Sequence, residues 1–326
     1  MLNYRRALGA ALATGSILLA TACGSAPPDA DRADSDQVSI VAAFYPLQFV
    51  SERIAGPHGQ VTTLTQPGTE PHDLELTPQQ IGSMGDADLV VYEKSFQAAV
   101  DTAVEQSGQT RVVDVASVVP LQPLPGTGGE HADHDHGGED HGGEDQHAEH
   151  DHGELDPHVW LDPANMIIIA EEVTAKLTEA DPDHATDYQT NLAALRTELE
   201  ALDGEFHTGL ESCQRKEFVV SHAAFGYLAR SYGLTQIGIS GLSPDNEPSP
   251  ARIAAVHDEI AQHDVTTIFY ETLVSPDVAN SIAGDLGLQT GVLDPLEGLT
   301  AESAGDDYLA VMRANLTALR TANACR

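Results

Sequence analysis

Short β-like runs alternate with helical segments along most of this chain, and no other feature of the sequence restricts the possible folds as strongly. Strands that alternate with helices form βαβ units, in which helices cover a mainly parallel sheet. Four runs precede residue 120 and four follow residue 216, so the sequence predicts an α/β fold with two four-stranded lobes. The predicted strands are residues 38–44, 61–66, 88–93 and 110–116, and then 217–222, 234–239, 266–271 and 288–294.

A long helix is predicted between the two sets of strands. In residues 182–210 apolar side chains recur every three or four positions, which marks one face of a helix, and no breaker occurs before Gly204. We therefore expect an N-terminal lobe over 38–181, a long rigid linking helix over 182–210 and a C-terminal lobe over 211–326. Such lobes leave a cleft between them, and ligands of parallel sheets bind at the carboxyl ends of the strands. The apolar positions are Leu192, Leu195, Leu199, Leu202, Phe206 and Leu210.

The N-terminus has the pattern of an export signal. Two arginines precede an apolar stretch of sixteen residues, Ala7–Ala22, which is shorter than the ~20 residues of a membrane span. Small residues lead directly to Cys23, as in a lipobox, in which the cysteine becomes the lipidated first residue. We predict a signal peptide over 1–22, a lipid at Cys23 and a flexible tether over 23–37, so that the protein is anchored to the outer face of the cell membrane. The alternative is an ordinary signal peptide that is cut before an incidental cysteine.

Two further cysteines, Cys213 and Cys325, lie in the second half of the chain. Disulfides persist in exported proteins, so the two thiols most simply pair with each other. The bond would close a loop of more than one hundred residues, to which the chain-entropy account assigns about 4–5 kcal/mol. Two unpaired, buried thiols are the alternative.

The formal net charge of −36, from 51 acidic and 15 basic residues, restricts the possible partners. Nucleic-acid binders need basic patches, so this charge argues against nucleic acid, and it also argues against binding anionic lipid through the protein surface. The same charge suits a protein that is exposed to cations.

Residues 120–155 lose the alternating pattern. Low hydrophobicity combined with high charge cannot offset the entropy of ordering, so we predict a mobile loop there. Residues 130–154 contain seven histidines and ten acids, without lysine or arginine. Either this segment gathers metal ions weakly near the cleft, by raising their local concentration, or it is a solvated spacer.

Other histidines and carboxylates stand where predicted strands end. His72 follows the second strand, His158 follows the acidic loop, and His222 ends the first strand of the C-terminal lobe. Glu271 and Asp294 end the last two strands. Three imidazoles with a carboxylate are a typical set of ligands for Zn²⁺. Each histidine alone has an ordinary explanation as a surface, capping or hydrogen-bonded core residue, and the combination is what predicts a metal site.

The local sequences around these histidines resemble the substrate-binding lipoproteins of bacterial zinc and manganese ABC importers. The resemblance covers residues 38–321 approximately, and the acidic, histidine-rich loop is typical of the zinc members. It rests on four segments, which read EPHDLELTP, DPHVWLDP, FVVSHAAFGYLARSYGL and IFYETLVSPDVANSIAGDLGLQTGVLDPLEGLT.

The resemblance implies a monomeric receptor, not an enzyme, that captures Zn²⁺ and delivers it to an ABC permease and its ATPase. It implies that His72, His158 and His222 are ligands. Manganese members tend to have a carboxylate in place of His222, and imidazole suits zinc better. For the fourth ligand we expect Glu271, because PLEGLT resembles the members that use glutamate, with Asp294 or water as the alternatives.

Three other functions stay open at this point. The first is a receptor for Mn²⁺ or another divalent ion. The second is a zinc metallohydrolase, against which stands the absence of an HExxH sequence and of a second carboxylate placed as a base. The third is a surface adhesin or metal buffer that uses the histidine-rich loop alone.

Overall fold

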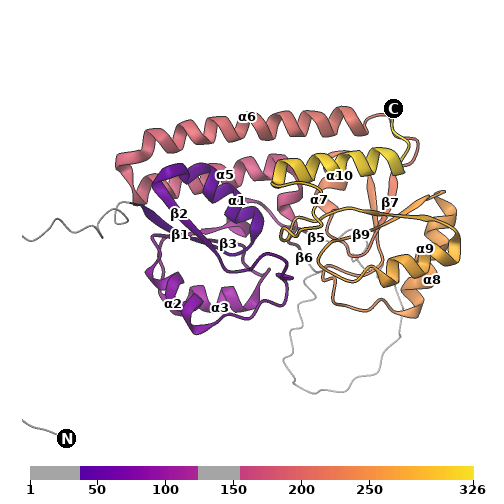
Figure 1. Ribbon diagram of the computed structural model, residues 1–326, viewed down its shortest axis with the longest axis horizontal. Coiled ribbons are helices and arrows are strands. Elements are labelled where there is room, and N and C mark those ends of the chain that lie inside the picture. Colours follow the sequence, from indigo (N-terminus) through magenta and orange to yellow (C-terminus); the bar gives the residue numbers. More distant parts are fainter. Residues whose placement is uncertain (1–36, 124–154) are drawn as a thin grey trace, which may run out of the picture. The chain divides into compact units, whose positions relative to one another are not determined.

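The computed structural model describes residues 37–123 and 155–326, and these contain two parallel four-stranded sheets (Figure 1). The two sheets confirm the predicted α/β fold with two four-stranded lobes. The first sheet has the order β2-β1-β3-β4, and the second has the order β10-β9-β7-β8. The strands are β1 Val38–Ala42, β2 Gly59–Thr63, β3 Leu89–Tyr92, β4 Val112–Asp114, β7 Glu217–Val220, β8 Thr235–Gly238, β9 Thr267–Tyr270 and β10 Gln289–Val292.

Both sheets have the same order along the chain. In each, the first strand lies between the second and the third, so β1 is flanked by β2 and β3, and β7 is flanked by β8 and β9. The chain reverses direction across the sheet at β1/β3 and at β7/β9. In open parallel sheets the crevice for a ligand lies outside the carboxyl ends of the strands at such a reversal.

Three details of the strands differ from the sequence prediction. The strand expected over 110–116 is only β4, because a helical turn, α4 (Val115–Val118), begins directly after Asp114 and is capped by its side chain. The second strand was expected over 61–66, but β2 begins two residues earlier, because Gly59 pairs with Val38 at the start of β1. A short antiparallel pair, β5 (Gln122–Pro123) and β6 (Leu155–Asp156), was not predicted. Two residues per strand are too few to produce a hydrophobic alternation in the sequence.

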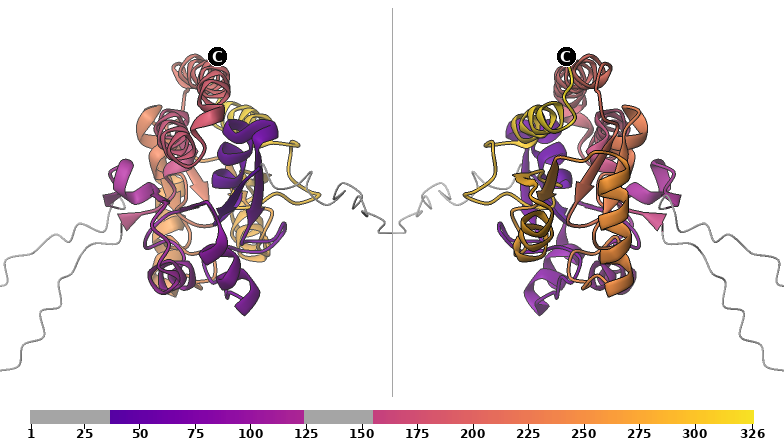
Figure 2. Two further views of the ribbon diagram at one scale, coloured as in Figure 1. Left: turned by 90° about the vertical axis from the view of Figure 1, so that its left-hand side faces the viewer. Right: turned by 90° about the vertical axis from the view of Figure 1, so that its right-hand side faces the viewer.

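The helices cover the sheets and connect the lobes. Helix α6 (Ala185–Leu210) contacts α1 and α5 of the N-terminal half, and it also contacts α10 at the C-terminus (Figures 1 and 2). Its apolar stripe is buried from Leu192 to Leu210, which explains the spacing seen in the sequence. The other helices are α1 Tyr45–Ala55, α2 Pro78–Asp86, α3 Ala98–Ser107, α4 Val115–Val118, α5 Pro163–Ala180, α7 Gly226–Ser231, α8 Pro250–Gln262, α9 Asp277–Leu286 and α10 Tyr308–Ala322, with short 3₁₀ turns at Gly56–His58, Val159–Leu161 and Pro182–His184.

Strand β7 separates two hydrophobic clusters. Phe218 and Val220 belong to a large cluster that also contains the N-terminal sheet and α10, whereas Val219 belongs to a smaller cluster under α8 and α9. The division follows from the two-residue period of a strand, which sends successive side chains to opposite faces of the sheet. The large cluster thus joins the two lobes through one face of the C-terminal sheet.

Some predictions concern residues outside the described part of the chain. These are the signal peptide, the lipid at Cys23, the tether and the histidine-rich segment 130–154. Within the described residues, none of the helices combines the length and the hydrophobicity that crossing a membrane requires.

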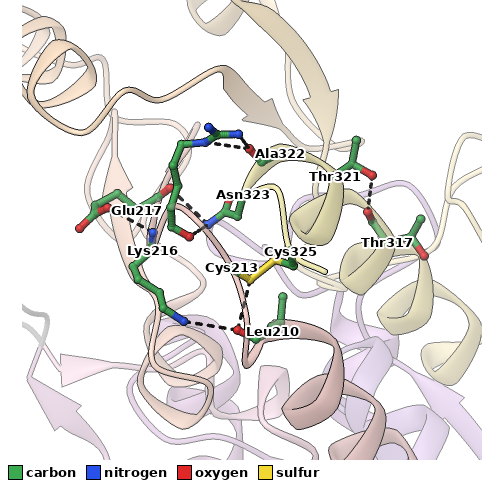
Figure 3. Close-up of a disulfide and its surroundings, with 10 residues drawn as sticks. Leu210, Cys213, Lys216, Glu217, Thr317, Thr321, Ala322, Asn323 and Cys325 are labelled. Carbon is green, nitrogen blue, oxygen red and sulfur yellow. Dashed lines mark hydrogen bonds between the residues drawn. A yellow bond between two sulfur atoms is a disulfide. The ribbon is translucent and has the colours of Figure 1, made fainter.

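The predicted disulfide between Cys213 and Cys325 is present (Figure 3). It joins positions 112 residues apart and fixes the end of the chain to the segment that leads into β7. Polar contacts reinforce the junction: the Arg215 guanidinium donates to the carbonyl of Ala322 at 2.7 and 3.1 Å, and the Asn323 side chain donates to the carbonyl of Arg215 at 3.1 Å.

We expect the double substitution of Cys213→Ser and Cys325→Ser to lower the free energy of unfolding by about 2–5 kcal/mol, because the unfolded chain regains the entropy of a long loop. Urea denaturation of the zinc-free protein measures this change without the contribution of bound metal. Wild-type protein with the disulfide reduced is the control and should unfold at the same urea concentration as the double variant. Equal stability of the oxidised protein and the variant would contradict the prediction.

Candidate metal centre

Three histidines and one glutamate converge between the two lobes. His72 lies on the loop after β2, His158 follows β6, His222 follows β7, and Glu297 lies on the loop after β10. The Oε1 atom of Glu297 lies 3.3 Å from Nε2 of His72, 3.1 Å from Nε2 of His158 and 3.2 Å from Nε2 of His222. The structure thus brings together all three predicted histidines, with a carboxylate that the sequence analysis had not selected.

The separations between the Glu297 oxygen and the three imidazole nitrogens fit a small ion bound between them. All four atoms lie within 4.8 Å of one another. A zinc ion bound at about 2.0–2.1 Å by tetrahedral ligands would place those ligands roughly 3.3–3.4 Å apart. The three distances from Glu297 are close to that separation. The side chains of His158, His222 and Glu297 are 0–1% exposed, and that of His72 is 11% exposed.

His158 is held from behind by Asp156. The Oδ1 atom of Asp156 accepts the His158 backbone N–H at 3.0 Å and lies 2.9 Å from its Nδ1. Tyr227 fixes the same segment by donating its hydroxyl to the carbonyl of Asp156. Gly226 leaves the space that the carboxylate needs, since a Cβ at that position would lie 2.3 Å from Oδ2 of Asp156.

His222 is held in the same way by Glu271. Oε1 of Glu271 lies 2.7 Å from Nδ1 of His222 and accepts the hydroxyl of Ser221 at 2.8 Å. Glu271 was the expected fourth ligand, but in this structure its oxygen faces the Nδ1 side of the ring, and Glu297 faces the Nε2 side.

The four side chains form an arrangement that is unfavourable without a cation or additional protons. Because Asp156 and Glu271 accept from Nδ1 of His158 and His222, the neutral tautomer of each ring carries its proton on Nδ1. The lone pair on each Nε2 then faces an oxygen lone pair of Glu297 at 3.1–3.2 Å. Either protons on Nε2 or a positive ion between these atoms removes the repulsion. A carboxylate behind a histidine is the usual arrangement around metal-ligating imidazoles.

The pKa values agree with this reading. Burial alone lowers the pKa of His158, but the bonds to Asp156 and Glu297 outweigh it and raise the pKa above its usual value. Burial also lowers the pKa of His222, and the charges of Glu271 and Glu297 raise it well above normal. For Glu297, burial raises the pKa, but the histidines reverse that effect and hold it well below its usual range. The centre therefore attracts positive charge.

A family model described as "Zinc-uptake complex component A periplasmic" (ZnuA) matches residues 40–322. The chain belongs to this family. The finding confirms the resemblance seen in the sequence, and it covers both lobes.

Individual relatives extend the comparison. The zinc-binding lipoprotein AdcA of Streptococcus pneumoniae serotype 4 is 37% identical over 311 residues, which are 94% of this chain and 60% of AdcA. The high-affinity zinc uptake system protein ZnuA of Bacillus subtilis is 36% identical over 322 residues, or 97% of this chain and 98% of that protein. The crystal structure of the Zn(II)-bound ZnuA-like domain of Streptococcus pneumoniae AdcA matches with a TM-score of 0.70 and 34% identity, over 88% of this chain and 99% of that domain. The chain therefore spans about 60% of the length of the AdcA relatives.

His72 lies in the first histidine segment that resembles the family. Glu70 accepts the His72 backbone N–H at 2.8 Å, and its Oε1 lies 4.0 Å from Nε2 of the ring. Burial, followed by the charge of Glu297, raises the pKa of Glu70 to about 9. Gln97 anchors the loop by donating to the carbonyl of Pro71 at 3.0 Å. Glu70 is a second acidic group at the centre that the sequence analysis missed.

Glu297 is placed by a tightly bonded turn. Asp294, the alternative fourth ligand, accepts the backbone N–H of Leu296 at 2.8 Å, and its own N–H donates to Asn315 of α10 at 2.9 Å. Leu296 has a positive φ of 59°, which turns the chain back toward the histidines. Trp160 holds the turn from the N-terminal side by donating Nε1–H to the carbonyl of Pro295 at 2.7 Å. Asp294 thus orders the loop, and Glu297 faces the rings.

A signal for Glu297 was present in the sequence. The glutamate of PLEGLT is Glu297 itself, and that segment was the reason for expecting a glutamate ligand. Glu271 was expected instead because it directly ends a strand, whereas Glu297 lies on the loop after β10.

Proposed function

We propose that the chain is an extracytoplasmic receptor that binds Zn²⁺ through His72, His158, His222 and Glu297 and delivers the ion to an ABC-type permease. The observation that carries the proposal is the approach of three imidazole Nε2 atoms to one carboxylate oxygen at 3.1–3.3 Å. In this proposal Glu297 replaces Glu271 as the fourth ligand, and Glu271 orients His222.

The choice of zinc over manganese follows from the donor atoms. Three imidazole nitrogens and one carboxylate suit zinc, whereas carboxylate, carbonyl and water oxygens suit Mn²⁺. The distances of 3.1–3.3 Å from the Glu297 oxygen to the three nitrogens also agree with the donor separation around a zinc ion. Relatives named as zinc-binding and zinc-uptake proteins support the same choice.

The donor set favours a receptor over a hydrolase. A catalytic zinc ion usually keeps one position for water, with three protein ligands. Here four protein side chains surround the proposed ion, and three of them are almost completely buried. The family description as a component of a zinc-uptake complex supports a permease and its ATPase as partners. A monomer with a lipid anchor at Cys23 completes the proposal.

Deletion of residues 130–154 tests the receptor against the metal-buffer alternative. We expect the shortened chain to keep one tight zinc equivalent, because the four proposed ligands lie outside the deleted segment. The full chain should bind additional, weaker equivalents through the seven deleted histidines. Titration against chelators of graded affinity at pH 7.5 separates the two populations. Loss of all tight binding in the shortened chain would refute the receptor proposal and favour a buffer.

Zinc affinity should fall as the pH decreases from about 8 to 5.5. A histidine must lose its proton to bind metal, and the pKa values of His158 and His222 are raised in the metal-free protein. Protons therefore compete at a pH where an ordinary histidine, with a pKa of ~6.5, is still neutral. Each displaced proton changes the apparent dissociation constant about tenfold per pH unit. Calorimetry in buffers of different ionisation enthalpy counts the protons, and a binding constant independent of pH would contradict the assignment of these ligands.

A further inference from the structure

A cavity of about 390 Å³ adjoins the metal centre at His72. Among the four side chains of the centre, His72 is the one that lines this cavity, and it is also the most exposed of the four, at 11% against 0–1% for the others. We call this cavity the vestibule. Six water molecules of about 30 Å³ each occupy roughly 180 Å³, so a fully hydrated ion fits inside it.

Segments of both lobes form the walls of the vestibule. On the N-terminal side they include Lys94, Ser95 and Phe96, and on the C-terminal side they include Leu242 and Ser243. The walls thus consist of apolar side chains and a few polar ones. One of the polar side chains, that of Lys94, carries a positive charge.

The N-terminal wall is fixed in place by several contacts. Ser95 has a positive φ of 72°, and its N–H donates to Asp101 at 2.9 Å. The Phe96 ring is 7% exposed and packs edge-on against His72 and against Phe44, at 4.7 Å in both cases. On the opposite wall Leu242 and Ser243 are half-buried, whereas Lys94 and Ser95 on the N-terminal wall are exposed.

Resting on the proposed function, we infer that the vestibule is the passage through which the ion enters and leaves the centre. An ion exchanges water for protein ligands only where water reaches its coordination shell. Water does not reach the side chains of His158, His222 and Glu297, because they are almost completely buried. It can reach the partly exposed ring of His72, which lines the vestibule. The size and charge of its walls then determine both the capture rate and the release rate.

Lys94 places a positive charge in the wall of the passage. The acidic surface of this chain, with a net charge of −36, attracts cations over a distance and raises their rate of arrival. A lysine in the wall of the vestibule opposes that attraction at the last step. The charge at position 94 should therefore change the association rate more than the same change elsewhere on the surface.

Ser243→Phe tests the passage by narrowing it. We expect zinc association and chelator-driven release both to slow by about tenfold, with the equilibrium constant unchanged within about twofold, because a passage affects both directions equally. Thr290→Phe on β10 is the matched control: it adds the same ring to a cavity of about 370 Å³ that the four ligands do not line. Trp160, the only tryptophan, lies 5.2 Å from the His158 ring and reports binding by its fluorescence.

Leu242→Ala widens the same passage and keeps the test valid if Ser243→Phe does not fold. It should speed both rates, again at constant affinity. The inference would be overturned if the wild type bound zinc tightly and both vestibule variants had unchanged rates. That result would leave the proposed function intact. Absence of tight binding in the wild type would instead refute the proposed function.

Lys94→Glu tests the charge. We expect zinc association to accelerate about two- to tenfold at low ionic strength, and the gain to disappear in about 0.5 M salt, where charges are screened within a few ångströms. Lys176→Glu on α5 makes the same change of net charge at a half-buried lysine that pairs with Glu179 and does not line the vestibule, and it should have a smaller effect. Equal acceleration in both variants would show that only the overall charge matters and would overturn the role of Lys94.

Discussion

Glu297→Gln should weaken zinc binding by about two to three orders of magnitude. Structural zinc sites with four ligands bind with about 10–16 kcal/mol, so one ligand corresponds to about 3–4 kcal/mol, or roughly 10²–10³-fold in affinity. Glutamine has nearly the same volume as glutamate, but it removes the negative charge that faces three imidazoles at 3.1–3.3 Å. Competitive titration with a chelator measures the loss, and circular dichroism verifies that the variant is folded.

Glu271→Gln is the matched control, because it makes the same chemical change on the other side of the His222 ring. Oε1 of Glu271 lies 2.7 Å from Nδ1 of that ring, and the loss of such an orienting carboxylate typically costs 10–100-fold in metal affinity. X-ray absorption should show a changed zinc coordination shell in Glu297→Gln and the wild-type shell in Glu271→Gln. The reverse result, with the larger loss and the changed shell in Glu271→Gln, would restore Glu271 as the fourth ligand.

His222→Glu should reduce the preference for zinc over manganese by at least about tenfold, since it exchanges an imidazole for the oxygen ligand that suits Mn²⁺. Zinc affinity itself should fall by about 10²–10³-fold, the contribution of one ligand. The new carboxylate would also lie next to Glu271 and Glu297, and like charges in a buried site repel one another unless a proton or a metal ion is bound. Parallel titrations with both metals give the ratio of affinities.

His222→Gln separates the loss of imidazole from the gain of a carboxylate. It removes the ring without adding charge, so zinc binding should weaken while manganese binding does not improve. If His222→Gln and His222→Glu had the same ratio of zinc to manganese affinity, the donor type at position 222 would not determine selectivity. The difference from the manganese receptors, which tend to have a carboxylate there, would then be without consequence for this chain.

The secondary structure and the disulfide could be predicted because they depend on local or compositional properties. The alternation of β-like runs with helices specifies two parallel sheets, and the long stripe from Leu192 to Leu210 specifies α6. Export leaves two cysteines in an oxidising compartment, and Cys213 and Cys325 are bonded. The three histidines could be found because they stand in segments that follow strands or the acidic loop, near the carboxyl edges where ligands collect.

The tertiary structure decided which of the candidate carboxylates faces the three imidazoles. Both Glu271 and Asp294 follow strands, as the sequence indicates, but the first lies against Nδ1 of His222 and the second against the N–H of Leu296. Glu297 reaches the rings because the turn before it is bonded to Asn315 and to Trp160. Those partners are 21 and 135 residues away from the turn residues that they hold. The periodicity of a sequence indicates which side chains are buried in strands and helices. The direction of a loop depends instead on such distant hydrogen bonds, and it becomes defined only when the two lobes and α10 have come together.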